Sequence, residues 1–414
     1  MVFQQDPEGG IEMQTSPRPI EPAHLAERLL GWFERHGRKH LPWQANPTPY
    51  RVWVSEVMLQ QTQVSTVIPY YERFVARFPT VEVLAAGPLD EVLHLWTGLG
   101  YYARARNLLA CARAILERHG GEFPREIEAV AALPGIGRST AGAILALARG
   151  ERHPILDGNA KRVLARVFGV EGDPGSASLL KALWAHADEC TPAEQAAAYT
   201  QAIMDLGATV CTRTRPACTV CPLSDGCVAA REGRQAQLPG LKRRRARKRR
   251  EAVLLIAESG ESPARAVLLE RRPAPGIWGG LWSPPQFESE SSALEWCRHE
   301  LGEPESTCPL APIDHGFTHF DLRLKPLRVR CALRTQASIA GHEVEARCRM
   351  EAAGEVEAVR ETEGPCHAGN VRGVEATPGT NARLWYSLRA PPKIGLPRPI
   401  AELLERMREE ERLA

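Results

Sequence analysis

The stretch LPGIGRSTAGAILAL, residues 133–147, places a proline and two glycines between two segments with helical hydrophobic spacing. Gly135 and Gly137 allow a tight turn and leave backbone N–H groups bare at the start of the second helix, where a phosphate can bind. A hairpin of this kind contacts a DNA backbone without reading its sequence. The competing interpretation is an ordinary connection between helices, which is commoner for an isolated Gly-x-Gly.

Residues 23–228 around this hairpin are predicted to form one all-helical domain. Apolar residues recur at helical spacing in several segments: 24–37, 51–64, 89–100, 105–120 and 139–150. The pattern changes after residue 250. AVLLIAES and ARAVLLERR predict a β-hairpin, and the alternation in DLRLKPLRVRCALR predicts a further strand. We therefore predict a multidomain chain in which an all-α domain precedes an α+β domain over residues 251–405.

Three segments carry no periodic pattern. Residues 1–22 are polar and contain several prolines, and we expect them to be disordered. Residues 229–250 form a predicted linker in which KRRRARKRR is basic at every position except Ala246; a solvated linker and a phosphate-contacting tether are equally favoured. Residues 337–380 are acidic and Gly-rich, so we expect a poorly ordered insertion.

The composition is typical of a soluble globular protein, with 43% hydrophobic residues, 25% charged residues and a net charge of +2. No apolar run reaches the length of a membrane span, and no hydrophobic signal core is found, so we expect a cytoplasmic protein without a membrane partner. The eleven cysteines are an odd number. Without a leader, this argues for a reducing compartment and against a disulfide framework.

Four cysteines follow a predicted helix with the spacing Cys-x6-Cys-x2-Cys-x5-Cys: Cys211, Cys218, Cys221 and Cys227. Four thiolates this close repel one another unless a cation shares them, and zinc and an iron–sulfur cluster are the two chemical options. Zinc sites usually pair their cysteines in two tight knuckles, whereas only the middle two have that spacing here. The spacing favours a metal centre, and a 4Fe–4S cluster over zinc.

Two carboxylates differ from the ordinary surface charges. Glu56 on a predicted helix has Val52, Trp53 and Leu59 as neighbours on its face. Desolvation there should raise the pKa of Glu56 toward a value useful for general acid catalysis. Asp157 ends an apolar run and begins a predicted helix, which is typical of an N-cap and compatible with a catalytic role.

Together these features resemble the helix–hairpin–helix DNA glycosylases. SEVMLQQTQV, GLGYYARARNL, LPGIGRSTAGA, ILDGNAKRVLAR and the cysteine spacing narrow the resemblance to the MutY-type adenine DNA glycosylases, over about residues 23–336 and 381–405. This resemblance implies base excision repair of adenine mispaired with 8-oxoguanine or guanine in double-stranded DNA. It also implies a monomer with a 4Fe–4S cluster on its four cysteines.

The resemblance assigns a role to individual residues. Glu56 is the acid that protonates adenine and activates water, and Asp157 stabilises the oxocarbenium-like sugar, as in glycosidases. The base must first leave the duplex stack. The further positions carried over are Gln61 and Tyr101 at the opened stack, Trp43 and Gln201 in the adenine pocket, and Arg213 and Arg215 as phosphate contacts of a loop shaped by the cluster.

Ser139 decides between two reaction types. Related bifunctional enzymes resembling endonuclease III carry a lysine there, whose amine forms a Schiff base and leads to strand cleavage. Serine lacks that amine, so we predict a monofunctional enzyme, with covalent trapping of DNA by Lys161 only as a side reaction.

The second domain resembles the Nudix-like domain that recognises 8-oxoguanine in this family. A carboxylate cluster for a divalent metal is lacking in the corresponding stretch, where Glu295 and Glu300 are scattered, so we expect recognition rather than pyrophosphate hydrolysis. The family's Phe-Ser-His loop corresponds to Phe317, Thr318 and His319, which keeps the hydroxyl and adds a methyl group. Packing at a strand end is the alternative interpretation of these side chains.

Two other functions compete with the adenine glycosylase. A bifunctional glycosylase/lyase is disfavoured by Ser139 and by the added second domain. A catalytically silent DNA-binding or redox-sensing iron–sulfur protein is disfavoured because a pure binder needs neither Glu56 nor Asp157.

Overall fold

The computed structural model describes residues 20–240, 247–260, 265–331 and 382–413. The expected insertion and most of the expected disordered N-terminal segment lie outside these residues. The chain divides into two compact units: Met1–Ala246 with Lys393–Arg398, and Arg247–Pro392 with Pro399–Ala414. No helix in the described ranges combines the length and apolar character that a membrane crossing requires.

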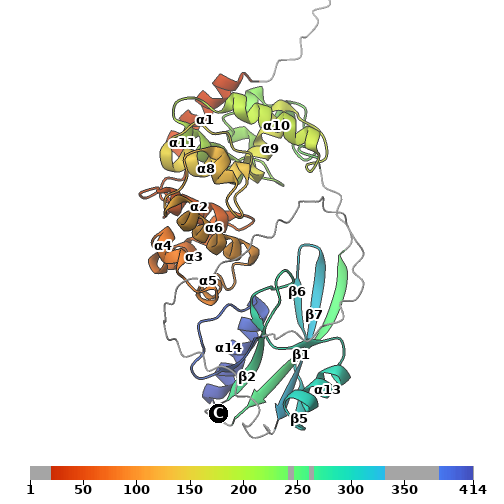
Figure 1. The fold of residues 1–414 in the computed structure, drawn as a ribbon. Coiled ribbons are helices and arrows are strands. Elements are labelled where there is room, and N and C mark those ends of the chain that lie inside the picture. The colour runs from red at the N-terminus through yellow and green to blue at the C-terminus, as the bar shows by residue number, and fades with distance from the viewer. Residues whose placement is uncertain (1–19, 241–246, 261–264, 332–381, 414) are drawn as a thin grey trace, which may run out of the picture. The chain divides into compact units, whose positions relative to one another are not determined.

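The first unit is built from helices (Figure 1). They are α1 Pro22–His36, α2 Pro49–Leu59, α3 Val64–Arg77, α4 Val81–Ala85, α5 Leu89–Leu95, α6 Ala103–His119, α7 Ile127–Ala131, α8 Arg138–Arg149, α9 Gly158–Phe168, α10 Ala177–Cys190, α11 Ala196–Thr209 and α12 Val228–Arg231, with short 3-10 turns at Cys218–Val220 and Ser224–Gly226. The predicted all-α domain is therefore confirmed.

Capping residues explain where several of these helices begin and end. Thr48 accepts a hydrogen bond from the backbone N–H of Arg51 at the start of α2, and Ser176 starts α10 in the same way. Gly120 and Gly169 end α6 and α9 in the left-handed conformation, which a residue without a Cβ adopts at low cost.

The predicted hairpin lies between α7 and α8. Gly135 has φ +76°, and a Cβ there would lie 2.7 Å from the Cβ of Asn107, so only glycine fits. Gly137 is the N-cap of α8 and has no side chain to cap the helix. The first backbone N–H groups of α8 are thus left for an outside acceptor, as the sequence predicted.

The predicted helix over residues 51–64 is wrong in its last third. The helix α2 ends at Leu59 and α3 begins at Val64. Between them, Gln61 has φ +58°, which interrupts the helix. At this end of α2, Arg104 of α6 donates hydrogen bonds to the carbonyl oxygens of Val57 and Met58.

The packing of four helices brings distant residues together. Helix α8 packs against α2 and α11, and α11 also packs against α9. One core of this unit includes Leu29, Leu164 and Leu206, none of which is exposed to solvent. This packing places the middle of α2 beside the starts of α8 and α9 and the face of α11.

The second unit contains a mixed β-sheet (Figure 1). Its strands are β1 Lys248–Ser259, β2 Ala266–Arg271, β3 Trp282–Ser283, β4 Gln286–Phe287, β5 Pro304–Pro309, β6 Ile313–Gly316, β7 Phe320–Cys331 and β8 Arg383–Ser387, and its helices are α13 Glu290–Glu300 and α14 Arg398–Leu413. The predicted α+β class is confirmed.

The sheet has the order β3-β2-β1-β7-β5, with β1 antiparallel to β2 and parallel to β7. The predicted hairpin and the predicted strand are therefore confirmed. Strand β1 begins at Lys248, so the last three residues of the basic run belong to this strand. Buried Leu255 and Val329 of β1 and β7 belong to the same core as Cys297 of α13.

Candidate active site and cysteine cavity

One open pocket of the helical unit collects most of the residues predicted to act on the base. Its lining includes Trp43, Glu56, Gln61, Ser139, Asp157 and Gln201. These residues lie as far as 158 positions apart in the sequence, and the packing of α2, α8, α9 and α11 brings them together. Of the other predicted DNA contacts in this unit, Tyr101, Gly135, Gly137, Lys161, Arg213 and Arg215 do not line the pocket.

Glu56 lies on the face of α2 that the sequence predicted. Val52 and Trp53 beside it are 2% and 0% exposed. Burial, together with the negative charge of Asp157, raises the pKa of Glu56 to about 8. At neutral pH this carboxyl group therefore holds a proton that it can donate.

Asp157 both caps a helix and faces the pocket. Its Oδ1 accepts a hydrogen bond from the backbone N–H of Ala160 at 2.7 Å, at the start of α9. Burial raises the pKa of Asp157, while the N–H groups of Ala160 and Asn159 oppose this by stabilising the ionised form. The two pocket carboxyls differ in this respect, because Glu56 has no such backbone donors among the groups that set its pKa.

Ser139 connects the hairpin helix to the segment before Asp157. Its Oγ accepts a hydrogen bond from the backbone N–H of Leu156 at 3.0 Å. The hydroxyl thus aligns the start of α8 with the start of α9 at the pocket wall. It offers no amine to a sugar in the pocket.

A buried carboxylate behind the pocket was missed from the sequence. Asp205 is 0% exposed, and its Oδ1 accepts hydrogen bonds from Arg38 Nη2 at 2.6 Å and from Gln201 Nε2 at 2.8 Å. Because an ionised carboxylate only accepts, it turns the amide nitrogen of Gln201 toward itself. A charged residue within the apolar run AIMDLGA was the signal that could have identified Asp205.

Arg162 joins the pocket to the cysteine loop and was also missed. Its Nη2 donates to Asn159 Oδ1 at 2.7 Å beside the pocket, and its Nε donates to the Cys211 carbonyl oxygen at 2.7 Å. No local sequence signal marks this role, because the partners are 49 positions apart.

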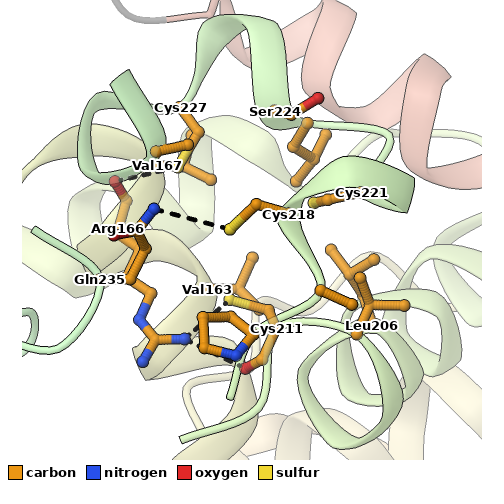
Figure 2. A pocket seen from close by; sticks show the side chains of 15 residues that line it. Val163, Arg166, Val167, Leu206, Cys211, Cys218, Cys221, Ser224, Cys227 and Gln235 are labelled. Carbon is orange, nitrogen blue, oxygen red and sulfur yellow. Dashed lines mark hydrogen bonds between the residues drawn. The ribbon is translucent and has the colours of Figure 1, made fainter. Parts of the chain in front are cut away.

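The predicted cysteine ligands border one small cavity (Figure 2): Cys211, Cys218, Cys221 and Cys227. Apolar side chains, among them Val163 and Leu206, form much of the remaining wall. Burial, together with the charges of the three neighbouring thiols, raises the pKa of the Cys221 thiol to about 12. The nine cysteines in the described residues are all free.

The thiols surround a space and do not meet at one point. No three His, Cys, Asp or Glu side chains in the described ranges lie close enough to hold a single metal ion. Hydrogen bonds from neighbouring residues reach two of the sulfurs, from Arg166 Nη1 to Cys211 Sγ at 3.4 Å and from Gln235 Nε2 to Cys218 Sγ at 3.7 Å (Figure 2).

Buried Arg166 also shapes the loop predicted to contact DNA. Its Nη1 donates to the Thr212 carbonyl oxygen at 2.7 Å, and its Nη2 to that of Arg213 at 3.0 Å. The side chains of Arg213 and Arg215 remain exposed. Buried Arg166 therefore fixes the backbone of the loop, whereas the charged side chains of Arg213 and Arg215 face solvent.

In the second unit, the predicted recognition residues form the turn between β6 and β7. The Phe317 ring stacks on Phe320 with centroids 4.5 Å apart and lies 5.5 Å from the Trp278 ring. Phe317 is thus packed at the strand end, whereas Thr318 and His319 are exposed. Trp278 was not identified from the sequence, because its contact with Phe317 spans 39 positions.

Two family models match the two units. The HhH-GPD superfamily of base excision DNA repair proteins matches residues 54–188, and the NUDIX domain matches residues 252–406. Among solved structures, a thermostable thymine-DNA glycosylase is 27% identical and covers 51% of this chain and 97% of its own, with a TM-score of 0.46.

Relatives of known name match over most of the chain. The adenine DNA glycosylase of Buchnera aphidicola subsp. Acyrthosiphon pisum (strain APS) is 33% identical over 383 residues, which covers 92% of this chain and 97% of the relative. That of Rattus norvegicus is 34% identical over 387 residues, covering 77% and 75%. Because the first match extends through both units at this identity, the chain belongs to the adenine DNA glycosylase family.

Proposed function

We propose that this protein is a monofunctional DNA glycosylase that removes adenine mispaired with 8-oxoguanine or guanine. The observation that carries the proposal is the pair of unlike carboxyls in one pocket. The pKa of Glu56 is raised to about 8, while backbone N–H groups stabilise the charge of Asp157. Burial also raises the pKa of Asp157, but only there do backbone N–H groups favour the ionised form. One pocket thus offers a proton donor and a second carboxyl supported as an anion, the pair that cleavage of an N-glycosidic bond requires.

The reaction begins with an adenine that has left the duplex stack and entered the pocket. Protonated Glu56 donates its proton to a ring nitrogen of adenine. The bond between sugar and base then breaks, and its electron pair leaves with the base. The ionised Asp157 stabilises the positive sugar cation by charge attraction. Glu56, now a carboxylate, accepts a proton from a water molecule that adds to the sugar carbon.

The product is an abasic site on an intact strand. A lyase step needs an amine at the sugar, and Ser139 supplies only a hydroxyl, which is already bonded to the backbone N–H of Leu156. Lys161 is not part of the pocket lining. These observations support a monofunctional reaction over the bifunctional alternative.

A 4Fe–4S cluster held by Cys211, Cys218, Cys221 and Cys227 is the second part of the proposal. A zinc ion draws its four ligands to one point, whereas a cluster spreads them around a larger body. The cavity between the four thiols fits the second arrangement. When bound, the cluster supplies a rigid cross-link within the loop. Arg166 then fixes the loop backbone at Thr212 and Arg213, and the exposed side chains of Arg213 and Arg215 can contact phosphates.

Recognition of the opposite base is assigned to the second unit. The β6–β7 turn exposes Thr318 and His319 on a support formed by Phe317, Phe320 and Trp278. These exposed groups can donate and accept hydrogen bonds, as reading the edge of 8-oxoguanine requires. Thr318→Val is expected to reduce the preference for 8-oxoguanine over guanine without changing the reaction itself.

The decisive experiment is a single-turnover assay on duplexes with adenine opposite 8-oxoguanine, guanine or thymine, each analysed with and without alkali. We expect strand scission only after alkali, fastest opposite 8-oxoguanine and absent opposite thymine. Scission before alkali would establish the lyase instead. Tight binding without base release from any duplex would establish the catalytically silent binder.

A further inference from the structure

The helix that carries Glu56 has an unusual C-terminal end. Helix α2 ends at Leu59 and has no basic residue in its last turn. The last carbonyl groups of a helix lack partners within the helix, and a cation beside them is stabilising. Arg104 of α6 provides this cation from another helix. Its Nη1 donates to the carbonyl oxygens of Val57 at 2.9 Å and Met58 at 2.7 Å.

The same guanidinium binds the loop that follows α2. Its Nη1 also donates to the carbonyl oxygen of Gln60 at 2.7 Å, and its Nη2 donates to Thr62 Oγ1 at 3.2 Å. These two partners flank Gln61 on either side. Gln61 is exposed and has φ +58°, a conformation that a residue with a side chain keeps only where its surroundings enforce it.

A second loop, before α6, is held in the same way. Nη2 of Arg104 donates to the carbonyl oxygens of Leu99 at 3.4 Å and Gly100 at 3.1 Å. The next residue, Tyr101, has φ +48° and is 48% exposed. The Arg104 guanidinium lies 5.5 Å from the Tyr101 ring centroid and 5.4 Å from that of buried Trp96, within range for attraction between a cation and an aromatic ring.

One buried side chain therefore fixes two exposed residues that are 40 positions apart, each in a left-handed conformation. Arg104 itself is only 8% exposed. Lysine could not replace it, because one nitrogen cannot span acceptors in the end of α2 and in both loops. The planar guanidinium does so with Nη1 and Nη2, whose N–H groups share the six acceptors. Burial lowers the pKa of Arg104 to about 10, which leaves the guanidinium charged at neutral pH.

We propose that Arg104 is a positioning residue that holds Gln61 and Tyr101 as one rigid two-pronged element, which keeps the base stack open while the target base occupies the pocket. The inference rests on the proposed function, because it requires a base that leaves a duplex. Arg104 acts only through the two loops and does not contact the substrate. Its contribution should thus be large where unpairing costs free energy and small where the base is already unpaired.

The test compares two substrates under single-turnover conditions: a duplex with adenine opposite 8-oxoguanine, and the same sequence with the adenine inside a short unpaired bubble. Arg104→Lys is expected to slow base release from the mismatched duplex by at least ~10-fold and to recover most of that loss on the bubble. Fluorescence of 2-aminopurine placed beside the target should show less unstacking with the variant than with the wild-type protein.

Arg113→Lys is the matched control. Arg113 lies on the same helix and donates to two backbone carbonyls, those of Ala85 at 3.2 Å and Gly87 at 3.3 Å, away from both loops. We expect it to release base from both substrates at wild-type rates. A melting temperature is measured for each variant to show that it is folded.

Equal slowing of Arg104→Lys on duplex and bubble would overturn the proposal, and so would wild-type rates on both. If Arg104→Lys does not fold, Thr62→Val is measured on both substrates. Because Thr62 also lines the pocket, the readout is the ratio of the two rates. Loss of one Arg104 bond should slow base release from the duplex more than from the bubble, and an unchanged ratio would overturn the proposal. Failure of the wild-type protein itself to release base from either substrate would count against the proposed function, which separates the two inferences.

Discussion

The carboxylate pocket and the cysteine cavity lie in the same helical unit but have opposite character. The pocket is wide and exposes polar and apolar groups together. Burial raises the pKa of both its carboxyls, and backbone N–H groups oppose that shift at Asp157 but not at Glu56. The cavity is far smaller, and the surface that its walls expose is apolar. Chemistry on a base needs access and a movable proton, whereas a structural cofactor needs a dry space that excludes water.

Arg162 connects these two regions, with one hydrogen bond to Asn159 beside the pocket and one to the Cys211 carbonyl oxygen. A change in either region can therefore reach the other through one side chain. Variants that affect only base removal, only DNA binding, or both will show how far the two regions act independently.

Glu56→Gln should have the largest effect, and this effect should be confined to the reaction in the pocket. Without the acid, single-turnover base release is expected to fall by about 10³-fold, within the range for loss of a general acid. Binding to the mismatched duplex should persist. The exposed Glu117→Gln on α6 is the matched control, and full activity of Glu56→Gln would contradict the assignment.

Cys218→Ser tests the cysteine cavity while leaving the carboxylate pocket unchanged. We expect loss of the iron–sulfur absorbance and of bound iron, a lower melting temperature, and at least ~10-fold weaker DNA binding as the basic loop loses its support. Cys308→Ser, at an exposed cysteine of the second unit, should change none of these. If the Cys218→Ser variant kept its bound iron and the absorbance of a cluster with four cysteine ligands, the ligand assignment would be contradicted.

The pH dependence follows from the raised pKa of Glu56. Because Glu56 acts in its protonated form, the rate should fall about tenfold per pH unit above about pH 8. Because Asp157 acts in its ionised form, the rate should fall again at low pH, which makes the profile bell-shaped. The same shift affects stability. The folded-state pKa is raised from 4.5, so stability is lost as pH rises through the window from 4.5 to about 8. Glu56→Gln should remove this loss, as thermal melts at a series of pH values would show.

Arg213→Gln should have the smallest effect. This exposed side chain is proposed to contact one phosphate, so its loss should weaken binding to all duplexes equally and reduce the slope of log K against log salt by about 0.9. Exposed Arg35→Gln on α1 serves as a control of equal charge change. An altered preference between mismatches would contradict a purely phosphate-directed role.

Much of the fold followed from local patterns. Helical spacing and capping signals located most helices, and the apolar neighbours of Glu56 on α2 indicated the direction of its pKa shift. The need for glycine at position 135 was equally local, because the turn itself requires φ +76°. The expected helix over residues 51–64 is wrong in its last third, where a side chain from α6 donates to the carbonyl oxygen of Met58 at the end of α2.

The sequence by itself determined the all-α and α+β division, the hairpin, the cysteine spacing and the two carboxylates, because each depends on neighbours within a few positions. Only the tertiary structure decided that Asp205 orients Gln201 from beneath the pocket, that Arg162 joins pocket to cavity, and that Arg104 unites two loops. The physical reason is that a buried arginine or carboxylate must find hydrogen-bonding partners wherever packing places them. Those partners follow from which helices meet, which the order of residues along the chain does not reveal.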